Sequence, residues 1–220
     1  MQQKIFYVRL LLLLLMPACF CHSAMAQKLP ADTVKILKLQ APDIFKARFT
    51  TSQGDFVMLV NRSWSPAGAD RLFQLITSGY YDNNMIFRAT KHYVQFGITD
   101  NPKLTRFWSK HPLPDEPVLQ SNLDSMVSFA SVGANGRSNQ VFINLLNHPG
   151  LDTSSFNGSK GFIPVAKIVE GMDVVRKFNT QYGDDIMYKN HDSLFLKGSE
   201  FLNRKFPGLD KIIKAEIVKE

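Results

Sequence analysis

Apolar and polar residues alternate along several short segments of this chain, and such alternation is typical of β-strands that bury one face. Residues 47–51 and 55–60 are two such segments, and the Ser-Gln-Gly turn between them predicts a β-hairpin. In the second segment, Phe56, Met58 and Val60 lie two residues apart. We therefore expect these three side chains to share the buried face.

The next segment changes to helical periodicity. Ser65 is suited to the N-cap, Pro66 to the first helical position and Gly79 to the C-terminal end. Apolar residues recur between them at spacings of three and four, namely Ala69, Leu72, Phe73 and Ile76. Such an apolar stripe must pack on another layer, and the strands on either side of it in the sequence make a sheet the expected partner.

Two later segments place single polar side chains among apolar ones. These polar residues are Arg88 and Gln95 in residues 85–98, and Gln140 in residues 127–144. A buried amide needs hydrogen-bond partners, which the backbone of a bound substrate can supply. We therefore expect these polar groups, with the aromatic residues beside them, to line a shallow apolar groove.

The rest of the chain adds strands, loops and two helices. Residues 99–122 contain four prolines and are predicted to be irregular, as are residues 145–161. Strands are predicted at 127–130, 140–144, 162–169 and 211–218, and helices at 171–180 and 193–206, the last with Ser193 as its cap. About eight strands with few helices predict a mainly β protein, a closed eight-stranded antiparallel barrel capped by two or three helices.

The N-terminal residues have the pattern of a secretory signal peptide. Lys4 and Arg9 precede an apolar run, and Ala24-Met25-Ala26 matches a cleavage site. The apolar run is short for a membrane span, so a permanent anchor is the weaker alternative. Lipidation at Cys19 is a further alternative, less favoured because Met16-Pro17-Ala18 is a poor context for it.

We therefore divide the chain into a signal peptide at 1–26, an N-terminal lead at 27–46 and one domain at 47–220. Loss of two basic residues with the signal peptide lowers the formal net charge from +7 to +5. Both cysteines, Cys19 and Cys21, also lie there, which excludes disulfides, thiolate catalysis and cysteine metal sites from the mature protein. Basic and acidic residues are interspersed, which indicates a mixed surface and no nucleic-acid partner.

Familiar catalytic motifs are missing from the sequence. There is no G-x-S-x-G and no H-E-x-x-H, and the glycine-rich residues 133–139 lack the Lys-Ser/Thr pair of a phosphate-binding loop. Carboxylates are scattered, and the histidines beyond the signal peptide have no metal-ligand spacing (His92, His111, His148 and His191). We expect neither a metal nor a cofactor.

Three ordered motifs resemble one protein family. FRATKHYVQFG (87–97), FASVGANGRSNQVFIN (129–144) and GFIPVAKIVEGMDVV (161–175) are similar to motifs of the cyclophilin-type peptidyl-prolyl cis/trans isomerases. The pattern is closest to exported bacterial members, whose middle motif likewise ends in Gln-Phe-Gly. The resemblance covers residues 47–180 and includes the hairpin and the helix described above.

The resemblance implies roles for individual residues. Arg88 matches the catalytic arginine of the family, and Tyr93 matches the aromatic floor of the proline pocket. Ser131 and Val132 fall where the family usually has Asn-Ala, whose backbone holds the residue before proline. The resemblance implies the following substrate-binding set: Tyr93, Gln95, Ser131, Val132, Gln140, Phe142, Leu151 and Phe162.

The implied activity is isomerisation of Xaa-Pro bonds in proline-containing segments of unfolded or exported proteins. We expect a monomer without a stable membrane span, located in the periplasm or secreted. Between Arg88 and Gln95 the chain is one residue shorter than is usual in the family. A catalytically weak peptide-binding or chaperone module is therefore the alternative, and an unrelated exported β-barrel is a more remote one.

Overall fold

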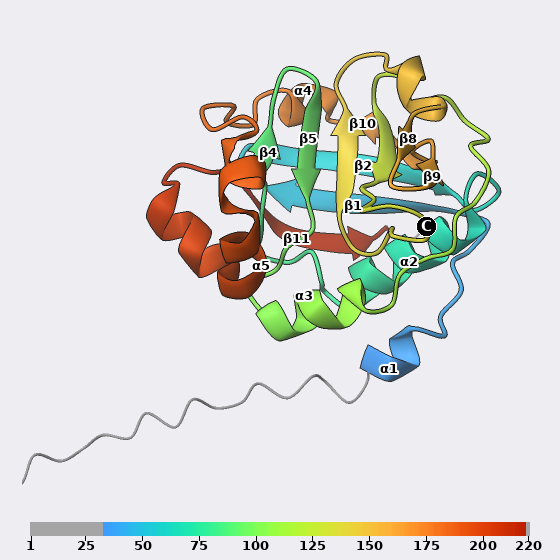
Figure 1. Ribbon diagram of the computed structural model, residues 1–220, viewed down its shortest axis with the longest axis horizontal. Helices are drawn as coiled ribbons and strands as arrows, with labels where there is room; N and C mark the ends of the chain where they lie inside the picture. The colour runs from blue at the N-terminus through green and yellow to red at the C-terminus, as the bar shows by residue number, and fades with distance from the viewer. Residues whose placement is uncertain (1–32, 219–220) are drawn as a thin grey trace, which may run out of the picture.

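The computed structural model describes residues 33–218 (Figure 1). The predicted signal peptide and the first part of the predicted lead lie outside the described residues. Among the described residues, no helix has both the length and the apolar content needed to cross a bilayer.

Most strands belong to one antiparallel sheet. Its strands, in chain order, are β1 (Ile44–Thr51), β2 (Gly54–Asn61), β3 (Asn84–Met85), β4 (Arg88–Ala89), β5 (Tyr93–Phe96), β6 (Met126–Phe129), β7 (Val141–Asn144), β10 (Pro164–Glu170) and β11 (Lys211–Ile217). They pair in the order β3-β11-β1-β2-β10-β6-β7-β5-β4. The edge strands β3 and β4 are separated in the chain only by Ile86 and Phe87, so the sheet curls round until its two edges meet.

The prediction of a mainly β, antiparallel, barrel-like fold with few helices is therefore confirmed. The main sheet has nine strands where about eight were expected. The additional strand arises because the chain changes partners at Ile86 and Phe87, leaving β11 and joining β5. Ile86 packs into the central core and Phe87 into a second apolar cluster, so the strand divides where its side chains enter different cores.

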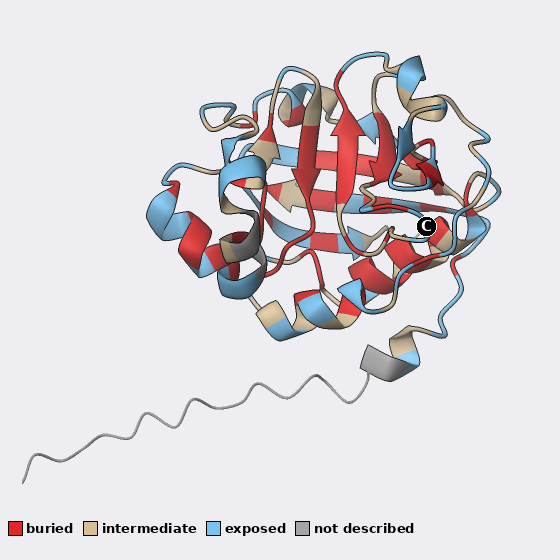
Figure 2. Cartoon of the chain, viewed as in Figure 1, coloured by how far each residue is buried: buried red, intermediate tan, exposed pale blue. Residues whose placement is uncertain are grey.

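The predicted hairpin is present and builds the centre of the core. β1 and β2 pair from Ile44 with Asn61 to Thr51 with Gly54, so Ser52 and Gln53 form the turn. Phe49 and Phe56 are cross-strand partners whose rings stack at 4.9 Å. Figure 2 shows buried positions along both strands, and those of β1 alternate with exposed ones. This side of the molecule is the rigid frame on which the loops are carried.

The predicted first helix is also present, as α2 (Pro66–Thr77), which packs against β10 and β11. Gly79 adopts a positive φ of 67°, which suits glycine, and its N–H donates to Ile76 while that of Tyr80 donates to Leu75. Gly79 thus ends the helix as predicted, although the side chain of Ser65 does not cap its start.

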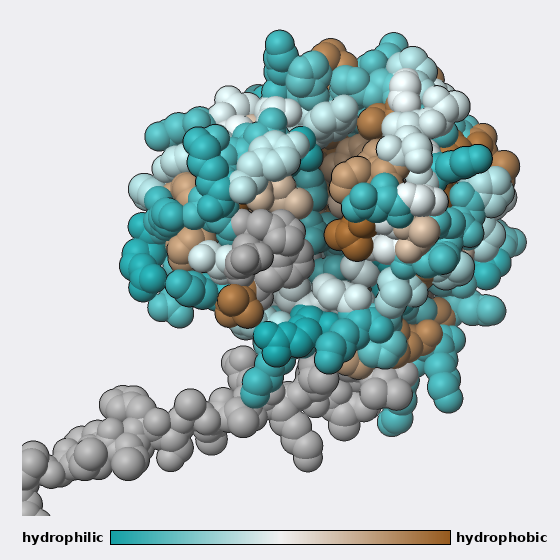
Figure 3. All heavy atoms as spheres, viewed as in Figure 1, coloured by the Kyte–Doolittle hydropathy of each residue, from teal (hydrophilic) through white to brown (hydrophobic). Residues whose placement is uncertain are grey.

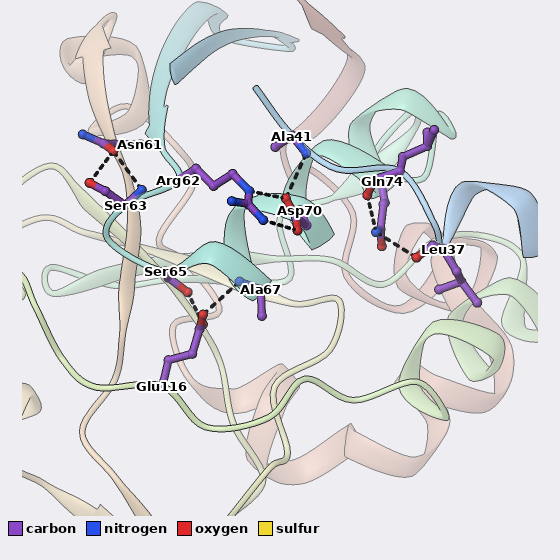
Figure 4. A network of polar contacts seen from close by, with 11 residues as sticks. Leu37, Ala41, Asn61, Arg62, Ser63, Ser65, Ala67, Asp70, Gln74 and Glu116 are labelled. Carbon is purple, nitrogen blue, oxygen red and sulfur yellow. Dashed lines mark hydrogen bonds and ion pairs between the residues drawn. The ribbon is translucent and has the colours of Figure 1, made fainter. Parts of the chain in front are cut away.

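The cap of α2 comes from a distant carboxylate (Figure 4). Glu116 accepts a hydrogen bond from the Ser65 hydroxyl at 2.5 Å and another from the Ala67 N–H at 2.8 Å. Arg137 donates to the same carboxylate at 2.9 Å. A negative charge here satisfies a free N–H of the first turn and complements the helix dipole. The loop that carries Glu116 is thereby fastened to the helix.

Figure 4 also shows how the residues before β1 are attached. Asp70 accepts hydrogen bonds from Arg62 at 2.8 and 3.0 Å and from the Ala41 N–H at 2.9 Å. Gln74 donates to the carbonyl oxygens of Leu37 and Leu39. These bonds tie the segment after α1 (Thr33–Ile36) to the outer face of α2.

The prediction that residues 99–122 are irregular was wrong for the first half. They include α3 (Pro102–Ser109), in which the Asn101 side chain accepts from the N–H groups of Lys103 and Leu104. The fully buried Trp108 anchors this helix to the core. An N-cap asparagine before a proline is a helix start signal, and it outweighs the prolines that follow.

The last predicted helix was placed incorrectly. α5 spans Asp185–Lys205, so Ser193 lies inside it and is not its cap. Its backbone departs from helical angles at Asn190 and Gly198, so the element is kinked. Its apolar side packs into a cluster that includes strand residues: Met85, Phe87, Ile98, Ile186, Leu194, Phe201, Leu202 and Phe206.

Two other segments differ from prediction in length. The helix expected at 171–180 is limited to α4 (Met172–Val175). The loop expected at 145–161 contains a 3-10 helix, η1 (Pro149–Asp152), and a small hairpin of β8 (Ser155–Phe156) and β9 (Ser159–Lys160). Both η1 and this hairpin contribute side chains to the site described next.

Candidate functional site

A pocket of about 350 Å³ opens over β4, β5 and β7. In Figure 3 the surface is hollowed between α5 and the loops on the opposite side, where hydrophobic side chains gather. Its lining is mostly apolar and aromatic: Arg88, Tyr93, Gln95, Ala130, Ser131, Phe142, Leu151, Phe156, Phe162, Met187 and Tyr188. Such a lining accepts a compact apolar group, and the few polar atoms orient it.

Among the described residues that line the pocket, Arg88 alone is cationic. Its Nη1 donates to Gln95 Oε1 at 3.1 Å, and its Nε donates to Asp184 Oδ1 at 2.6 Å. The guanidinium carbon lies 5.4 Å from the centre of the Tyr93 ring. Arg88 and Gln95 are direct cross-strand partners in the β4–β5 ladder, which explains how their side chains meet.

Gln95 connects this arginine to the neighbouring strand. It is 2% exposed, and its Nε2 donates to Gln140 Oε1 at 3.0 Å. Both ends of the buried amide are therefore satisfied. Gln140 itself is outside the pocket lining and contributes through its hydrogen bond to Gln95. Asp184, Arg88, Gln95 and Gln140 thus form one continuous chain of hydrogen bonds.

Three aromatic rings form the apolar floor. Tyr93 meets Phe142 edge to face at 5.6 Å, and Phe142 meets Phe162 in the same way at 5.4 Å. The Phe162 N–H donates to the Leu151 carbonyl at 2.9 Å, which brings Leu151 to the pocket wall. Burial raises the pKa of Tyr93, an effect that the nearby Arg88 opposes, so its hydroxyl is neutral at physiological pH.

Ser131 and Val132 have different positions. Ser131 lines the pocket, and its hydroxyl donates to the Gly133 carbonyl at 2.7 Å. Val132 is 71% exposed and lies outside the pocket lining. The structure therefore brings seven of the nine sequence-predicted residues together in the lining. Gln140 is outside it but bonded to Gln95, and Val132 is outside it.

The shortened segment between Arg88 and Gln95 does not displace the pocket residues. The Thr90 hydroxyl accepts from the N–H groups of His92 and Tyr93, each at 3.0 Å, which forms a tight turn. Tyr93 and Gln95 then lie on the same face of β5, while Val94 between them is buried in the core. The turn absorbs the missing residue.

Sequence reasoning missed five residues at this site. Ala130, Phe156, Met187 and Tyr188 line the pocket, and Asp184 binds Arg88. Met187 and Tyr188 lie in the first turn of α5, and Asp184 directly precedes this helix, about a hundred residues after Arg88. Nothing in their local pattern indicates which strand they pack beside. The one available signal was the presence of large apolar side chains in otherwise polar stretches.

Side chains of the types that bind metals are not clustered among the described residues. Among residues 33–218, no three His, Cys, Asp or Glu side chains lie close enough together to hold a metal ion.

Comparison with known proteins gives consistent results. A family model described as "Cyclophilin type peptidyl-prolyl cis-trans isomerase/CLD" matches residues 46–193. The chain is 30% identical over 134 residues to peptidyl-prolyl cis-trans isomerase-like 3 of Rhizopus delemar, covering 56% of this chain and 74% of that protein. It is 24% identical over 135 residues to peptidyl-prolyl cis-trans isomerase B of Escherichia coli, covering 59% and 80% respectively.

Solved structures share the fold. A crystal structure of a cyclophilin type peptidyl-prolyl cis-trans isomerase from Cryptosporidium parvum superposes with a TM-score of 0.58 at 16% identity, covering 80% of this chain and 99% of that one. A second structure of that protein, determined in the presence of the dipeptide Ala-Pro, gives a TM-score of 0.57. Together with the match over residues 46–193, these results place the chain in a family: it belongs to the cyclophilin-type peptidyl-prolyl cis/trans isomerases.

Proposed function

We propose that this protein is a peptidyl-prolyl cis/trans isomerase in which Arg88 is the catalytic residue. The observation that supports this most directly is the position of Arg88. Its guanidinium is held by Gln95 beside the Tyr93 ring, at the edge of an apolar pocket suited to a proline ring.

Isomerisation of an Xaa-Pro bond requires a hydrogen-bond donor beside an apolar site, and this pocket has both. Rotation about an Xaa-Pro bond passes through a twisted state with a barrier of roughly 18–20 kcal/mol, in which amide resonance is lost. The prolyl nitrogen then regains a lone pair. A guanidinium that donates toward that nitrogen stabilises the twisted state more than the planar one, and this difference is catalysis. Arginine remains charged at any relevant pH, so no proton transfer is needed.

The aromatic floor holds the substrate. Tyr93, Phe142 and Phe162 form a continuous apolar surface for the pyrrolidine ring, and Leu151 completes its side. Exclusion of water from this surface strengthens the hydrogen bond from Arg88. The family resemblance assigns the backbone beside Ser131 to the residue before proline, and the position of Ser131 in the pocket lining supports this role.

Replacement of Arg88 tests the proposal. Arg88→Ala should lower kcat/KM for isomerisation of a Xaa-Pro test peptide about 100-fold, the loss that follows removal of one transition-state donor. Arg176→Ala is the matched control, because Arg176 also pairs with a carboxylate, that of Asp124, but lies outside the pocket lining. A wild-type protein that does not accelerate the reaction, or an Arg88→Ala protein as fast as wild type, would refute the proposal.

The second candidate function is a peptide-binding or chaperone module with little turnover. The ion pair of Arg88 with Asp184 favours it, because part of the guanidinium is already engaged. In that case Arg88→Ala would bind unfolded proteins as well as wild type does. Titration of proline peptides into both proteins would separate binding from turnover.

We further propose that the protein is exported and acts, as a monomer, on proline-containing segments of exported proteins. The Ala24-Met25-Ala26 site and the basic residues before it support export to the periplasm or the medium, as for the exported bacterial type. Mass spectrometry of the mature protein should find Gln27 at the N-terminus. A lipidated Cys19 at that terminus would contradict this choice, and sedimentation would test the monomer.

A further inference from the structure

The start of α5 reaches the pocket from a part of the chain remote from the strand motifs. Met187 and Tyr188 belong to the pocket lining, and Asp184 precedes them by one turn. Asp184 is the residue that binds Arg88, through Nε at 2.6 Å. The segment is therefore in direct contact with both the apolar and the cationic parts of the site.

The backbone of this segment is tied to the strand that carries Arg88. Gly183 and Ala89 form an isolated antiparallel bridge, and these are the immediate chain neighbours of Asp184 and Arg88. On the other side of Asp184, Ile186 is fully buried in a cluster with Phe87. Asp184 is thus fixed on both sides to the strand residues that flank Arg88, and its contact with the guanidinium is built into the fold.

The two hydrogen bonds of Arg88 act at different nitrogens. A guanidinium has five N–H donors in one plane, and a single hydrogen bond leaves that plane free to rotate. Asp184 holds Nε, and Gln95 holds Nη1. No described residue accepts a hydrogen bond from Nη2. With two nitrogens fixed, the plane is set and the remaining donors are available to a substrate.

Asp184 orients the guanidinium, which favours catalysis, but its charge opposes catalysis. A carboxylate lowers the positive potential of the arginine. That effect is limited here, because the Asp184 side chain is 45% exposed and solvent screens it. Orientation is not screened by solvent, and small displacements of a catalytic group are costly. Orientation is therefore the larger effect.

We propose that Asp184 is a positioning residue that orients Arg88 for isomerisation. This inference rests on the proposed function of Arg88. It adds a residue outside the sequence motifs to the catalytic apparatus, and it assigns the start of α5 a part in the reaction. The ion pair is partly exposed and adds little to global stability, so a loss of rate cannot be attributed to unfolding.

The test compares Asp184→Ala and Asp184→Asn with the control Asp185→Ala. Asp185 is the adjacent carboxylate, pairs with Lys189 at 3.0 Å and lies outside the pocket lining. Asp184→Ala should lower kcat about tenfold and leave KM within about twofold, as expected when orientation in the transition state is lost. Asp184→Asn keeps an oxygen acceptor for Nε and should retain most of the rate. Asp185→Ala should match wild type.

A second measurement separates this inference from the proposed function. The ¹⁵N–¹H signal of Arg88 Nε should be distinct in the wild type, move to the position of free arginine in Asp184→Ala, and remain near its wild-type position in Asp185→Ala. A wild type without isomerase activity would refute the proposed function, and the signal would still test the contact. The positioning role would be overturned by an Asp184→Ala protein with unchanged or higher kcat, or by an Arg88 Nε signal that does not move.

Discussion

The two sides of the pocket are built in different ways. On the strand side, Arg88, Tyr93 and Gln95 come from adjacent strands whose register is set by a continuous ladder of backbone hydrogen bonds. On the helix side, Asp184 and Tyr188 come from a segment that meets the strands through an isolated bridge and a small apolar cluster. The strand side is thus defined by pairing between neighbouring strands, and the helix side by tertiary contacts between distant parts of the chain.

The backbone of α5 is also less regular than that of β5. It departs from helical angles at Asn190 and Gly198, whereas β5 pairs without interruption along its length. Local opening has a lower free-energy cost where few backbone hydrogen bonds and few buried contacts must break. We therefore expect the helix side to open locally before the strand side does. Asp184 is the helix-side residue whose change should alter the rate, because it contacts Arg88 directly.

Of the changes that compare the two sides, Gln95→Ala is expected to have the largest effect on catalysis. This change removes the acceptor for Arg88 Nη1 and leaves Gln140 without its partner, so kcat/KM should fall roughly 10- to 100-fold. Gln140→Ala should have a smaller effect, because Gln140 reaches Arg88 only through Gln95. Steady-state isomerisation rates measure both. A larger loss for Gln140→Ala would show that the order of the hydrogen-bonded chain is wrong.

The effect of Ile186→Ala is expected on stability, with a smaller effect on catalysis than that of Gln95→Ala. Ile186 is fully buried in the α5 cluster, and such truncations cost about 2–5 kcal/mol. Hydrogen exchange should increase first in α5, before the sheet opens. The matched strand-side variant is Ile143→Ala, also fully buried, which should destabilise the whole domain. Identical hydrogen-exchange patterns in the two variants would show that the helix side and the strand side do not differ in local stability.

The smallest effect is expected from Tyr188→Ala. This side chain is 76% exposed, so the free energy of unfolding should change by less than about 0.5 kcal/mol. KM should rise about two- to threefold for peptides with a large apolar residue beside proline, a change of well under 1 kcal/mol in binding. Leu196→Ala is the control, since Leu196 is exposed on the same helix outside the pocket lining. Equal KM values for the two variants would argue against a contact from Tyr188.

The strand side could be predicted from sequence because its information is local. Alternation defined β1 and β2, and the polar residues Arg88 and Gln95 stood out against apolar neighbours. Once β4 and β5 form a hairpin, their pairing follows from the short connection between them. The family resemblance supplied the roles of these residues, which periodicity alone does not give.

The helix side could not be predicted because its position depends on tertiary contacts. The pairing of Asp184 with Arg88 spans 96 residues, and no local pattern marks it. The start of α5 was also misplaced, since Ser193 is a plausible cap by type while the element continues from Asp185. Val132 was assigned from the motif alone, and its outward orientation depends on how the glycine-rich loop folds.

The cap of α2 by Glu116 has a consequence for the order in which the protein folds. The acceptor for the Ala67 N–H lies 49 residues further along the chain. A growing chain therefore presents α2 with an incomplete first turn until the segment around Glu116 has been synthesised. Non-local closure of this kind is slow compared with the formation of a helix turn. The first helix of the domain thus depends on a segment about fifty residues further along the chain, and we expect it to remain open to chaperones during that interval.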